Sequence, residues 1–366
     1  MTQWRFFNPV DVRFGPGVLD QVGKAIGGRN WVLVTHPDAA LLPWRGRLLA
    51  AAGKPVMMLD DIAPNPSLAM LRHMCGQLAQ AAGSVELVVA LGGGSVMDSA
   101  KFLAAGHGRF DPVLSYLEDE GALTAMALPV IAIPTTAGTG SELTKWATVW
   151  DPEQGRKLSL NRDDLYAEAA FIDPLITAGL PWSITLASGL DALSHALESI
   201  WNINANPVTR SFAVAAADDV MTGLGRLQSD PGDGDARTLL ARGAMRAGLA
   251  FSNTQTALAH NISYPVTLDH GIAHGIACSF CLPEVMAAAI GIDADCDAAL
   301  HLIFGDLAAA PHHLRATLDA LGVPSTPMAV GVGEDAWRKI VADAFDGPRG
   351  RNFLGSRDRF PAAGVS

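Results

Sequence analysis

Two segments in the second half of the sequence carry side chains that could bind a divalent metal ion. Asp191 and His195 stand four residues apart in SGLDALSHALES, a spacing that places both side chains on one face of a helix. The segment ALAHNISYPVTLDHGIAHGIACS adds His260, His270 and His274. A single histidine in such a segment is more often a hydrogen-bonded core residue. Because buried polar groups need partners, several candidate ligands together favour a metal site, and one oxygen with several nitrogens suits Fe²⁺ or Zn²⁺ better than Mg²⁺ or Ca²⁺.

A glycine-rich turn in the first half could bind a phosphate group. The apolar run ELVVAL leads directly into Gly92, Gly93, Gly94 and Ser95, and a helix-like stretch, VMDSAKFLAAG, follows. Glycines let the backbone approach a pyrophosphate, and the amides at the positive end of the helix dipole favour its negative charge. The turn is not the ordinary GxGxxG fingerprint, because Met97 occupies the position of the third glycine. A purely structural turn is the alternative interpretation.

A second polar loop, PTTAGTGSE at residues 134–142, follows the apolar run PVIAI. In open α/β sheets, ligands bind beyond the carboxyl ends of parallel strands, where small polar residues of this kind are useful. The alternative is a helix start capped by Thr139 or Ser141. The two loops together favour a nucleotide site.

The order of apolar segments predicts the elements that must position these residues. Short β-rich runs at 31–35, 55–59, 86–91 and 129–133 alternate with helical stretches, which is typical of a parallel sheet flanked by helices. Beyond about Pro174, long stretches rich in Ala and Leu at 183–200, 208–227 and 237–250 follow a helical period. We therefore predict an α/β domain over 1–180 and a helical domain over 181–366, with a polar loop at 229–235 and a loosely held tail from 347 onward.

Composition limits the kind of protein this chain can be. Its 366 residues suffice for about two domains, and a charged fraction of 17%, against about 25% in ordinary soluble chains, indicates extensive buried or shared surface. The net charge of −11, without a long basic run, argues against nucleic acid as a partner. Four scattered cysteines do not make a disulfide framework, and we interpret Cys278 and Cys281 as small core residues rather than a redox or zinc pair.

The sequence carries no apolar stretch of about 18 residues or more, so we expect no membrane span. Charges and prolines interrupt the N-terminal segment, MTQWRFFNPVDVRFGPG, and make a secretory signal improbable. We therefore expect a soluble, cytoplasmic protein.

Taken in order, the motifs resemble the iron-containing (group III) alcohol dehydrogenase family, which shares its fold with glycerol dehydrogenase and dehydroquinate synthase. The resemblance covers nearly the whole chain. It rests on VRFGPG, APNPS at 63–67, GGGSVMDSAK, PTTAGTGSE, the DP at 173–174, GLDALSHALES and HGIACSFCLP. No single motif decides it, but the ordered set is specific.

The resemblance implies a dinucleotide-binding α/β domain followed by an all-α domain, with cofactor and metal meeting in the cleft between them. By position, the family's ligands for Fe²⁺ or Zn²⁺ fall on Asp191, His195, His260 and His274. The resemblance also places Asp98 beside the nicotinamide, so we predict that Asp98 is a catalytic residue as well as a cofactor-binding one. The full set that the resemblance assigns to the NAD or NADP site is Gly92, Gly93, Gly94, Ser95, Asp98, Thr135, Thr136, Thr139 and Lys157.

Three positions depart from the family pattern. Tyr264 replaces a histidine that many members use for proton relay, and His270 replaces an aromatic residue four positions before the last metal histidine. We therefore expect Tyr264 or His270 to move the proton. His36, with Asp38 two residues on, stands where many NAD-preferring members carry an acidic residue, so NADP use stays open beside NAD.

The resemblance implies a metal-dependent NAD(P) alcohol dehydrogenase or aldehyde reductase. The segments TKWATVWD, KLSL and HNISYPVT look most like the branch that reduces phosphonoacetaldehyde to 2-hydroxyethylphosphonate, with Lys145, Arg162 and His270 as candidate cationic partners of the phosphonate. The rivals are a lyase or cyclase that recycles bound NAD, as in dehydroquinate synthase, and a non-catalytic metal- or nucleotide-binding protein. The expected partners are a small alcohol or aldehyde and further copies of the chain, as in a dimer.

Overall fold

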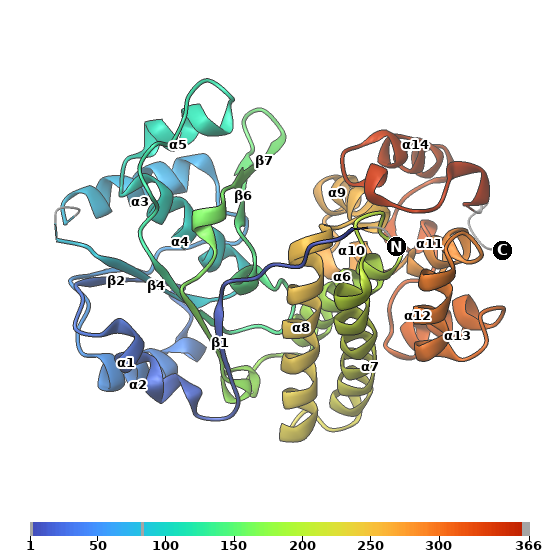
Figure 1. The fold of residues 1–366 in the computed structure, drawn as a ribbon, viewed down its shortest axis with the longest axis horizontal. Helices are drawn as coiled ribbons and strands as arrows, with labels where there is room; N and C mark the ends of the chain where they lie inside the picture. The colour runs from blue at the N-terminus through green and yellow to red at the C-terminus, as the bar shows by residue number, and fades with distance from the viewer. Residues whose placement is uncertain (1–2, 82–83, 361–366) are drawn as a thin grey trace. The chain divides into compact units, whose positions relative to one another are not determined.

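The computed structural model describes residues 3–81 and 84–360, which group into two compact units. The α/β unit takes in residues 8–136 and 140–179, and the helical unit takes in residues 3–7, 137–139 and 180–360. Figure 1 shows the sheet of the first unit in blue to green and the helices of the second in yellow-green to red. The predicted fold class, a parallel-sheet α/β domain plus an all-α domain, is confirmed.

The α/β unit is built on six parallel strands in the order β1-β8-β5-β4-β2-β3. All residues of β2, β4, β5 and β8 are buried, because helices cover both faces of a parallel sheet. The strand bounds are β1 Asp11–Phe14, β2 Trp31–Thr35, β3 Met57–Leu59, β4 Leu87–Gly92, β5 Val130–Pro134 and β8 Ala169–Ile172.

The strand order creates the edge on which a nucleotide site is expected. The chain runs from β2 outward to β3 and then returns to place β4 on the other side of β2, so the order reverses between β2 and β4. Ligands of open α/β sheets bind beyond the carboxyl ends of the strands at such a reversal. The carboxyl ends here are Thr35 of β2, Gly92 of β4 and Pro134 of β5, on three neighbouring strands.

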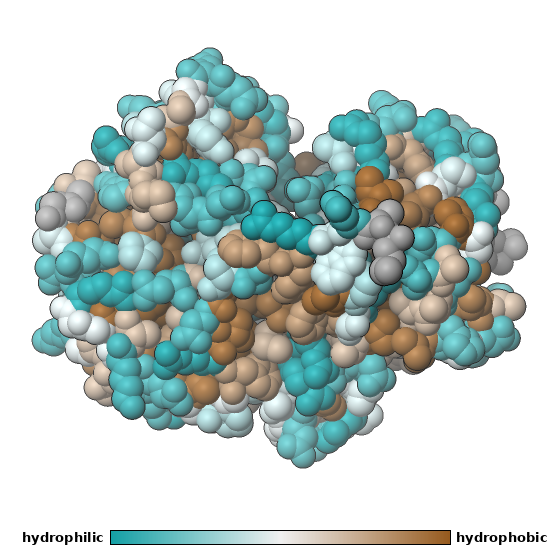
Figure 2. All heavy atoms as spheres, viewed as in Figure 1, coloured by the Kyte–Doolittle hydropathy of each residue, from teal (hydrophilic) through white to brown (hydrophobic). Residues whose placement is uncertain are grey.

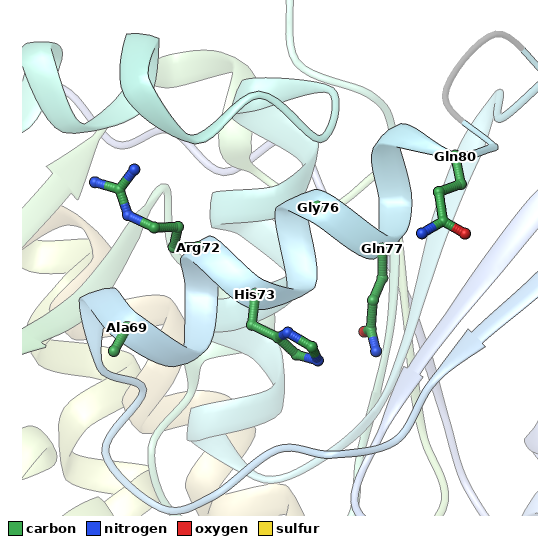
Figure 3. Close-up of a pocket in the computed structure, with 6 residues that line it drawn as sticks. All are labelled: Ala69, Arg72, His73, Gly76, Gln77 and Gln80. Carbon is green, nitrogen blue, oxygen red and sulfur yellow. The ribbon is translucent and has the colours of Figure 1, made fainter.

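Five α-helices, several short 3-10 helices and a hairpin complete the described part of this unit. Ser67 caps α3 by accepting a hydrogen bond from the amide of Met70, and α3 carries on its outer side a hollow of about 400 Å³ (Figure 3). The hollow is lined by Ala69, Arg72, His73, Gly76, Gln77 and Gln80, none of which is a predicted site residue. The bounds are α1 Val22–Ile26, α2 Leu42–Ala52, α3 Leu68–Ala79, α4 Gly94–Gly106, α5 Phe110–Leu117, β6 Trp146–Asp151 and β7 Arg156–Asn161.

The helical unit packs its helices around one large apolar core. Its helix α7 starts at a capping box in which Asn206 and Thr209 satisfy each other's backbone amides, with Pro207 at the first helical position. The bounds are α6 Trp182–Ile200, α7 Pro207–Ser229, α8 Gly234–Thr254, α9 Leu258–His270, α10 His274–Ser279, α11 Leu282–Ala289, α12 Ala294–Phe304, α13 Ala310–Ala320 and α14 Glu334–Asp346.

Surface character agrees with the low charged fraction. The face shown in Figure 2 mixes hydrophilic and hydrophobic residues, and single apolar side chains such as Met126 and Leu302 are largely exposed. No helix in residues 3–81 and 84–360 has the length and apolar character needed to cross a membrane.

The four expected strands and the three expected long helices are confirmed. The prediction of a loosely held tail is wrong for residues 347–360. Phe353 and Phe360 are only 5% and 6% exposed and belong to the core of the helical unit. Phe353 also forms a backbone bridge with Asn202. The prediction was wrong here because polar residues surround these two aromatics in the sequence, although both aromatics anchor the segment to the core. Residues 361–366 lie outside the described part of the chain.

Replacing Phe353 with Ala should destabilise the helical unit by about 3 kcal/mol, since a Phe-to-Ala change in a core removes apolar burial and leaves a cavity. Denaturant unfolding would measure the loss. Leu302→Ala, at a side chain 75% exposed, is the matched control and should change stability by less than about 0.5 kcal/mol. Equal effects of the two changes would contradict the anchoring role.

Candidate functional site

Three helices of the helical unit bring the predicted metal ligands together. Asp191 and His195 lie on α6, His260 lies on α9, and His274 is the first residue of α10. Helix α10 can approach α6 this closely because residue 275 is glycine: a Cβ there would lie 1.8 Å from the carbonyl oxygen of Ala187. The glycine after His274 therefore sets the position of that histidine.

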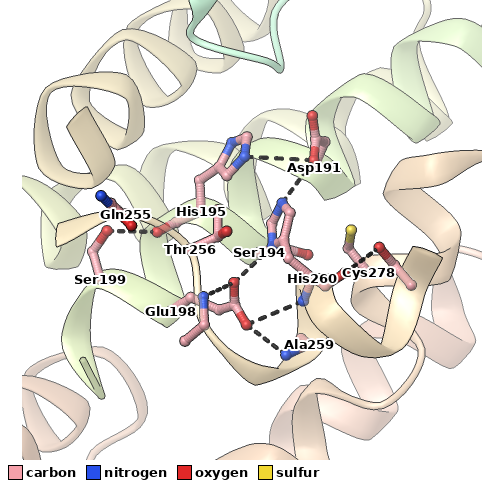
Figure 4. A network of polar contacts seen from close by, with 12 residues as sticks. Asp191, Ser194, His195, Glu198, Ser199, Gln255, Thr256, Ala259, His260 and Cys278 are labelled. Atoms are coloured by element: carbon pink, nitrogen blue, oxygen red, sulfur yellow. Dashed lines mark hydrogen bonds and ion pairs between the residues drawn. The ribbon is translucent and has the colours of Figure 1, made fainter. Parts of the chain in front are cut away.

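One carboxylate oxygen forms the centre of the group. Oδ1 of Asp191 lies 3.7 Å from Nε2 of His195, 3.4 Å from Nε2 of His260 and 3.8 Å from Nε2 of His274 (Figure 4 draws the first two contacts). All three histidines thus turn the same ring nitrogen toward one oxygen. Asp191, His195 and His260 are buried, while the side chain of His274 is 40% exposed and forms the open side of the pocket.

These residues fit a divalent ion. Donors that each lie about 2.1 Å from an ion are about 3.0 to 3.4 Å apart, so the separations from Oδ1 of Asp191 need only a small contraction around a metal. Donor atoms of Asp191, His260 and His274 also lie within 4.8 Å of one another, whereas His195 lies outside that group. Oδ1 of Asp191 and Nε2 of His260 are fully buried and have no hydrogen-bond partner among the described residues. Buried polar atoms without partners are costly, and a metal ion would satisfy both.

Glu198 holds the ring of His260 in an orientation that turns Nε2 toward Asp191. Its Oε2 lies 2.6 Å from Nδ1 of His260, which leaves Nε2 of that ring facing Asp191 (Figure 4). The same carboxylate accepts hydrogen bonds from the backbone amides of Ala257, Ala259 and His260, so it also caps the start of α9. Carboxylate partners of this kind fix the ring and strengthen a metal-bound histidine.

His195 is oriented by stacking. Its ring lies on Phe251 with centroids 4.0 Å apart and on His260 with centroids 4.7 Å apart. Burial lowers the pKa of His195 to about 4, so this imidazole is neutral at neutral pH. Burial alone would raise the pKa of Asp191, but the neighbouring His195, His260 and His274 hold it below its ordinary range. A neutral imidazole and an ionised carboxylate are the forms that bind metals.

Sequence reasoning missed the contribution of Cys278 to this pocket. Its Sγ lies 3.6 Å from Nε2 of His274, and donor atoms of Asp191, His260, His274 and Cys278 all lie within 4.8 Å of one another. Cys278 is buried, as expected of a core residue, but that interpretation is incomplete. The signal was present in the sequence, because position 278 is four residues after His274 and so shares its helix face.

The residues expected to move the proton lie beside the pocket and at the end of α9. Tyr264 is partly buried and stacks on His274, with ring centroids 6.5 Å apart and planes 4° from parallel. His270 is exposed at the last position of α9. Tyr264 therefore has the closer relation to a metal ligand.

In the α/β unit, the predicted phosphate turn joins β4 to α4. Gly92 is required by packing, because a Cβ there would lie 2.3 Å from the side chain of Val96. A Cβ on Gly93 would lie 3.4 Å from Oγ1 of Thr136, so the turn and the loop after β5 are neighbours, with Thr135 at the start of that loop. The amides of Gly94 and Ser95 belong to the first turn of α4, where helix geometry supplies no acceptor. The turn is thus suited to a phosphate.

Asp98 is held by two hydrogen bonds, from the hydroxyl of Ser141 and from the amide of Thr148. Burial raises its pKa, and the nearby Lys101, these two hydrogen bonds and Lys157 moderate the rise. Lys157 is exposed on β7 and lies over the ring of Trp150. Both predicted residues therefore lie in one neighbourhood of the α/β unit.

Two more predicted cofactor residues follow β2. The amide of Asp38 donates to Nδ1 of His36, and the carboxylate of Asp38 accepts from the amide of Ala40. Asp38 is thus a local helix cap at the carboxyl edge of the sheet. Thr139 belongs to the short segment that groups with the helical unit, where a Cβ on Gly138 would lie 2.5 Å from the carbonyl oxygen of Ser188.

Two of the three cationic side chains suggested for a phosphonate, Lys145 and Arg162, are already paired. Lys145 lies 2.6 Å from Asp163, and Arg162 binds Asp164 and the carbonyl oxygens of Leu123 and Ala125. A substrate anion would have to displace these partners.

Beneath the loop after β5, Lys101 and Glu142 form a buried charged cluster, 1% and 5% exposed. The ammonium of Lys101 donates to the carbonyl oxygens of Ser141 and Trp146 and to the hydroxyl of Thr144. Burial lowers the pKa of Lys101 to about 8 and raises the pKa of Glu142 to about 7. This cluster anchors the loop that follows β5.

The raised pKa of Glu142 makes stability depend on pH. The folded state holds this proton more tightly than the unfolded state, so its stabilising effect is complete below pH 4.5 and is lost as the pH rises to about 7. Between pH 5 and pH 8, Glu142→Gln should gain up to about 3 kcal/mol relative to the unmodified protein in denaturant unfolding. The exposed Glu120→Gln is the control, and a curve for Glu142→Gln parallel to that of the unmodified protein would contradict the assignment.

Glu198→Gln should weaken metal binding by roughly 10- to 100-fold, because an outer-sphere partner is lost while every ligand remains. Competition with a chelator measures the affinity. Glu284→Gln alters a partly buried carboxylate, paired with Arg315, and should leave metal binding unchanged. Unchanged affinity in Glu198→Gln would refute the orienting role of this residue.

Comparison with known proteins agrees with the geometry. The family model for "Iron-containing alcohol dehydrogenase" matches residues 9–174, and the model for "Fe-containing alcohol dehydrogenase family, C-terminal" matches residues 185–353. The chain is 32% identical to long-chain-alcohol dehydrogenase 1 of Geobacillus thermodenitrificans, over 90% of this chain and 87% of that protein. It is 33% identical to phosphonoacetaldehyde reductase of Streptomyces viridochromogenes, over 86% of this chain and 75% of that protein.

A solved structure leads to the same conclusion. Sulfoacetaldehyde reductase from Bifidobacterium kashiwanohense, in complex with NAD⁺, superposes with a TM-score of 0.87 at 28% identity, covering 97% of this chain and 95% of that one. The chain belongs to the iron-containing alcohol dehydrogenase family.

Proposed function

We propose that the protein is a metal-dependent NAD(P)-linked oxidoreductase that interconverts a small aldehyde and its alcohol. The observation that carries the proposal is the convergence of three histidine nitrogens on one oxygen of Asp191. In a member of this family, that pocket would bind the aldehyde or alcohol, and the glycine turn at the reversal of strand order would bind the nicotinamide cofactor. These are the two partners of a hydride transfer. Residues 181–366 would hold the metal and residues 1–180 the cofactor.

Asp191, His195, His260 and His274 would hold Fe²⁺ or Zn²⁺. When bound, such an ion supplies Lewis acidity toward a carbonyl oxygen. Glu198 keeps Nε2 of His260 turned into the pocket, and stacking on Phe251 fixes His195. These contacts orient the donors before substrate arrives, and orientation can supply several kcal/mol of the reduction in barrier.

The remaining residues bind the cofactor and move a proton. The amides at the start of α4 would hold the pyrophosphate of NAD or NADP, and Gly92 and Gly93 would give it access to the backbone. In the reducing direction, hydride goes to the carbonyl carbon and a proton goes to the oxygen. Tyr264, stacked on His274, is the proposed proton carrier, with the exposed His270 as the alternative.

The substrate we propose is a short aldehyde that carries an anionic group, such as phosphonoacetaldehyde, which would yield 2-hydroxyethylphosphonate. Relatives named phosphonoacetaldehyde reductase and sulfoacetaldehyde reductase support an anionic head group. His36 in place of an acidic residue supports use of NADP as well as NAD, since a carboxylate there would repel a 2′-phosphate.

We further propose that the enzyme is a cytoplasmic homo-oligomer, such as a dimer. A charged fraction of 17% supports surface shared between copies. The four cysteines are all free and buried, which suits a reducing compartment.

Oxidation of NADH and NADPH by the protein loaded with Fe²⁺ or Zn²⁺ would test the proposal, with phosphonoacetaldehyde, sulfoacetaldehyde and succinic semialdehyde as substrates. We expect net consumption of the reduced cofactor with at least one of these aldehydes. A lyase that regenerates its bound NAD in each turnover would show no net consumption. His260→Ala should lose bound metal and turnover together, whereas the exposed His301→Ala should retain both. A metal-free His260→Ala protein that still turns over would refute the mechanism.

A further inference from the structure

The pocket contains one more side chain with a donor atom than the proposed function uses. Cys278 lies on α10, one turn after His274, and its side chain is fully buried. Figure 4 shows its sulfur beside the ring of His260. Four donor atoms, from Asp191, His260, His274 and Cys278, lie within 4.8 Å of one another.

The position of the sulfur suits metal coordination. A thiolate about 2.3 Å and an imidazole nitrogen about 2.1 Å from one ion are separated by about 3.1 to 3.6 Å, depending on the angle at the ion. Sγ of Cys278 lies 3.6 Å from Nε2 of His274. The sulfur and the ring nitrogen can therefore bind the same ion with almost no movement of α10.

A hydrogen bond to His274 accounts for only part of this arrangement. Sγ lies 3.6 Å from Nε2 and 3.8 Å from Nδ1, within the range of a weak hydrogen bond to sulfur but without a preference for one ring nitrogen. Nearby, Nε2 of His260 and Oδ1 of Asp191 are buried without hydrogen-bond partners among the described residues. These two atoms independently mark the same space as a cation site.

We propose that Sγ of Cys278 is a further ligand of the metal ion, which makes the site a mixed oxygen, nitrogen and sulfur site. The proposal rests on the metal pocket of the proposed function and adds to it. The sulfur would join Asp191, His260 and His274, whose donor atoms lie within 4.8 Å of it and of one another.

A sulfur ligand changes which ions the pocket prefers. Thiolates bind Zn²⁺, Co²⁺ and Cd²⁺ well and add little for Mn²⁺ or Mg²⁺. Removing the sulfur should therefore weaken binding of Zn²⁺ roughly tenfold or more while binding of Mn²⁺ changes little. Cys278 would then set part of the selectivity of the pocket among divalent ions, in addition to the Asp and His ligands.

Cobalt substitution tests the proposal without any assay of turnover. The full-length protein is freed of metal, reloaded with Co²⁺, and its spectrum recorded in the visible and near-ultraviolet. Visible bands report that Co²⁺ occupies the pocket, and a strong near-ultraviolet charge-transfer band reports sulfur bound to cobalt. We expect both kinds of band in the unmodified protein and loss of only the charge-transfer band in Cys278→Ser.

Cys281→Ser is the matched control, because Cys281 is also buried and lies only three residues further on. It should keep the charge-transfer band. Bound Co²⁺ without that band in the unmodified protein, or persistence of the band in Cys278→Ser, would overturn the proposal and leave the four-ligand metal site intact. Failure to bind Co²⁺ at all would overturn the metal site itself, and with it the proposed function.

If Cys278→Ser does not fold, ¹¹³Cd resonance of the unmodified protein decides the question without substitution. A shift characteristic of one sulfur ligand supports the proposal, and a shift characteristic of oxygen and nitrogen ligands alone refutes it.

Discussion

The geometry of the predicted metal pocket depends on the hydrogen bonds that the buried carboxylate of Glu198 makes with the start of α9 and with the ring of His260. This carboxylate is fully inaccessible to solvent, so its charge must be balanced within the protein. Four donors do this: Nδ1 of His260 and the backbone amides of Ala257, Ala259 and His260. One side chain of α6 therefore fixes where α9 begins and how His260 is rotated. Because Asp191 and His195 lie on the same α6, their distances to His260 follow from this single anchor.

The α/β unit uses a buried charge in a comparable way. Lys101 of α4 reaches the loop after β5 and holds the carbonyl oxygens of Ser141 and Trp146. Asp98, one turn earlier on the same helix, accepts from Ser141 and Thr148. The helix whose first turn is suited to phosphate thus also fixes the neighbouring loop. In both units, a polar side chain buried on a helix positions the backbone of a segment distant in sequence.

Much of this could be predicted from the sequence, because it depended on local pattern. The strand at 31–35 is a short β-rich apolar run and the segment at 183–200 follows a helical period, and the structure places these elements at 31–35 and 182–200. The spacing of Asp191 and His195 was enough to place both on one helix face. Joining them to His260 and His274 required the family resemblance, since no periodicity relates residues on different helices.

Other features could not be predicted because they depend on tertiary contacts. Strand β1, with one exposed and three partly buried residues, exists only through its pairing with β8. Phe353 and Phe360 lie in a polar segment whose burial is decided by the core they enter. Cys278 reaches Asp191, His260 and His274 only because α10 packs against α6, where Gly275 permits close approach.

The pairing of β1 with β8 also has a consequence for how the chain acquires its structure. Asp11 to Phe14 pair with Ala169 to Ile172, so the first strand of the sheet is held by the last. During synthesis, the first strand must wait, unpaired, until nearly half of the chain has been made. Contacts of such long sequence separation slow folding, because chain entropy is lost before they form. Pairing of β1 is therefore a late event, and until it occurs this edge strand is available to pair with another chain.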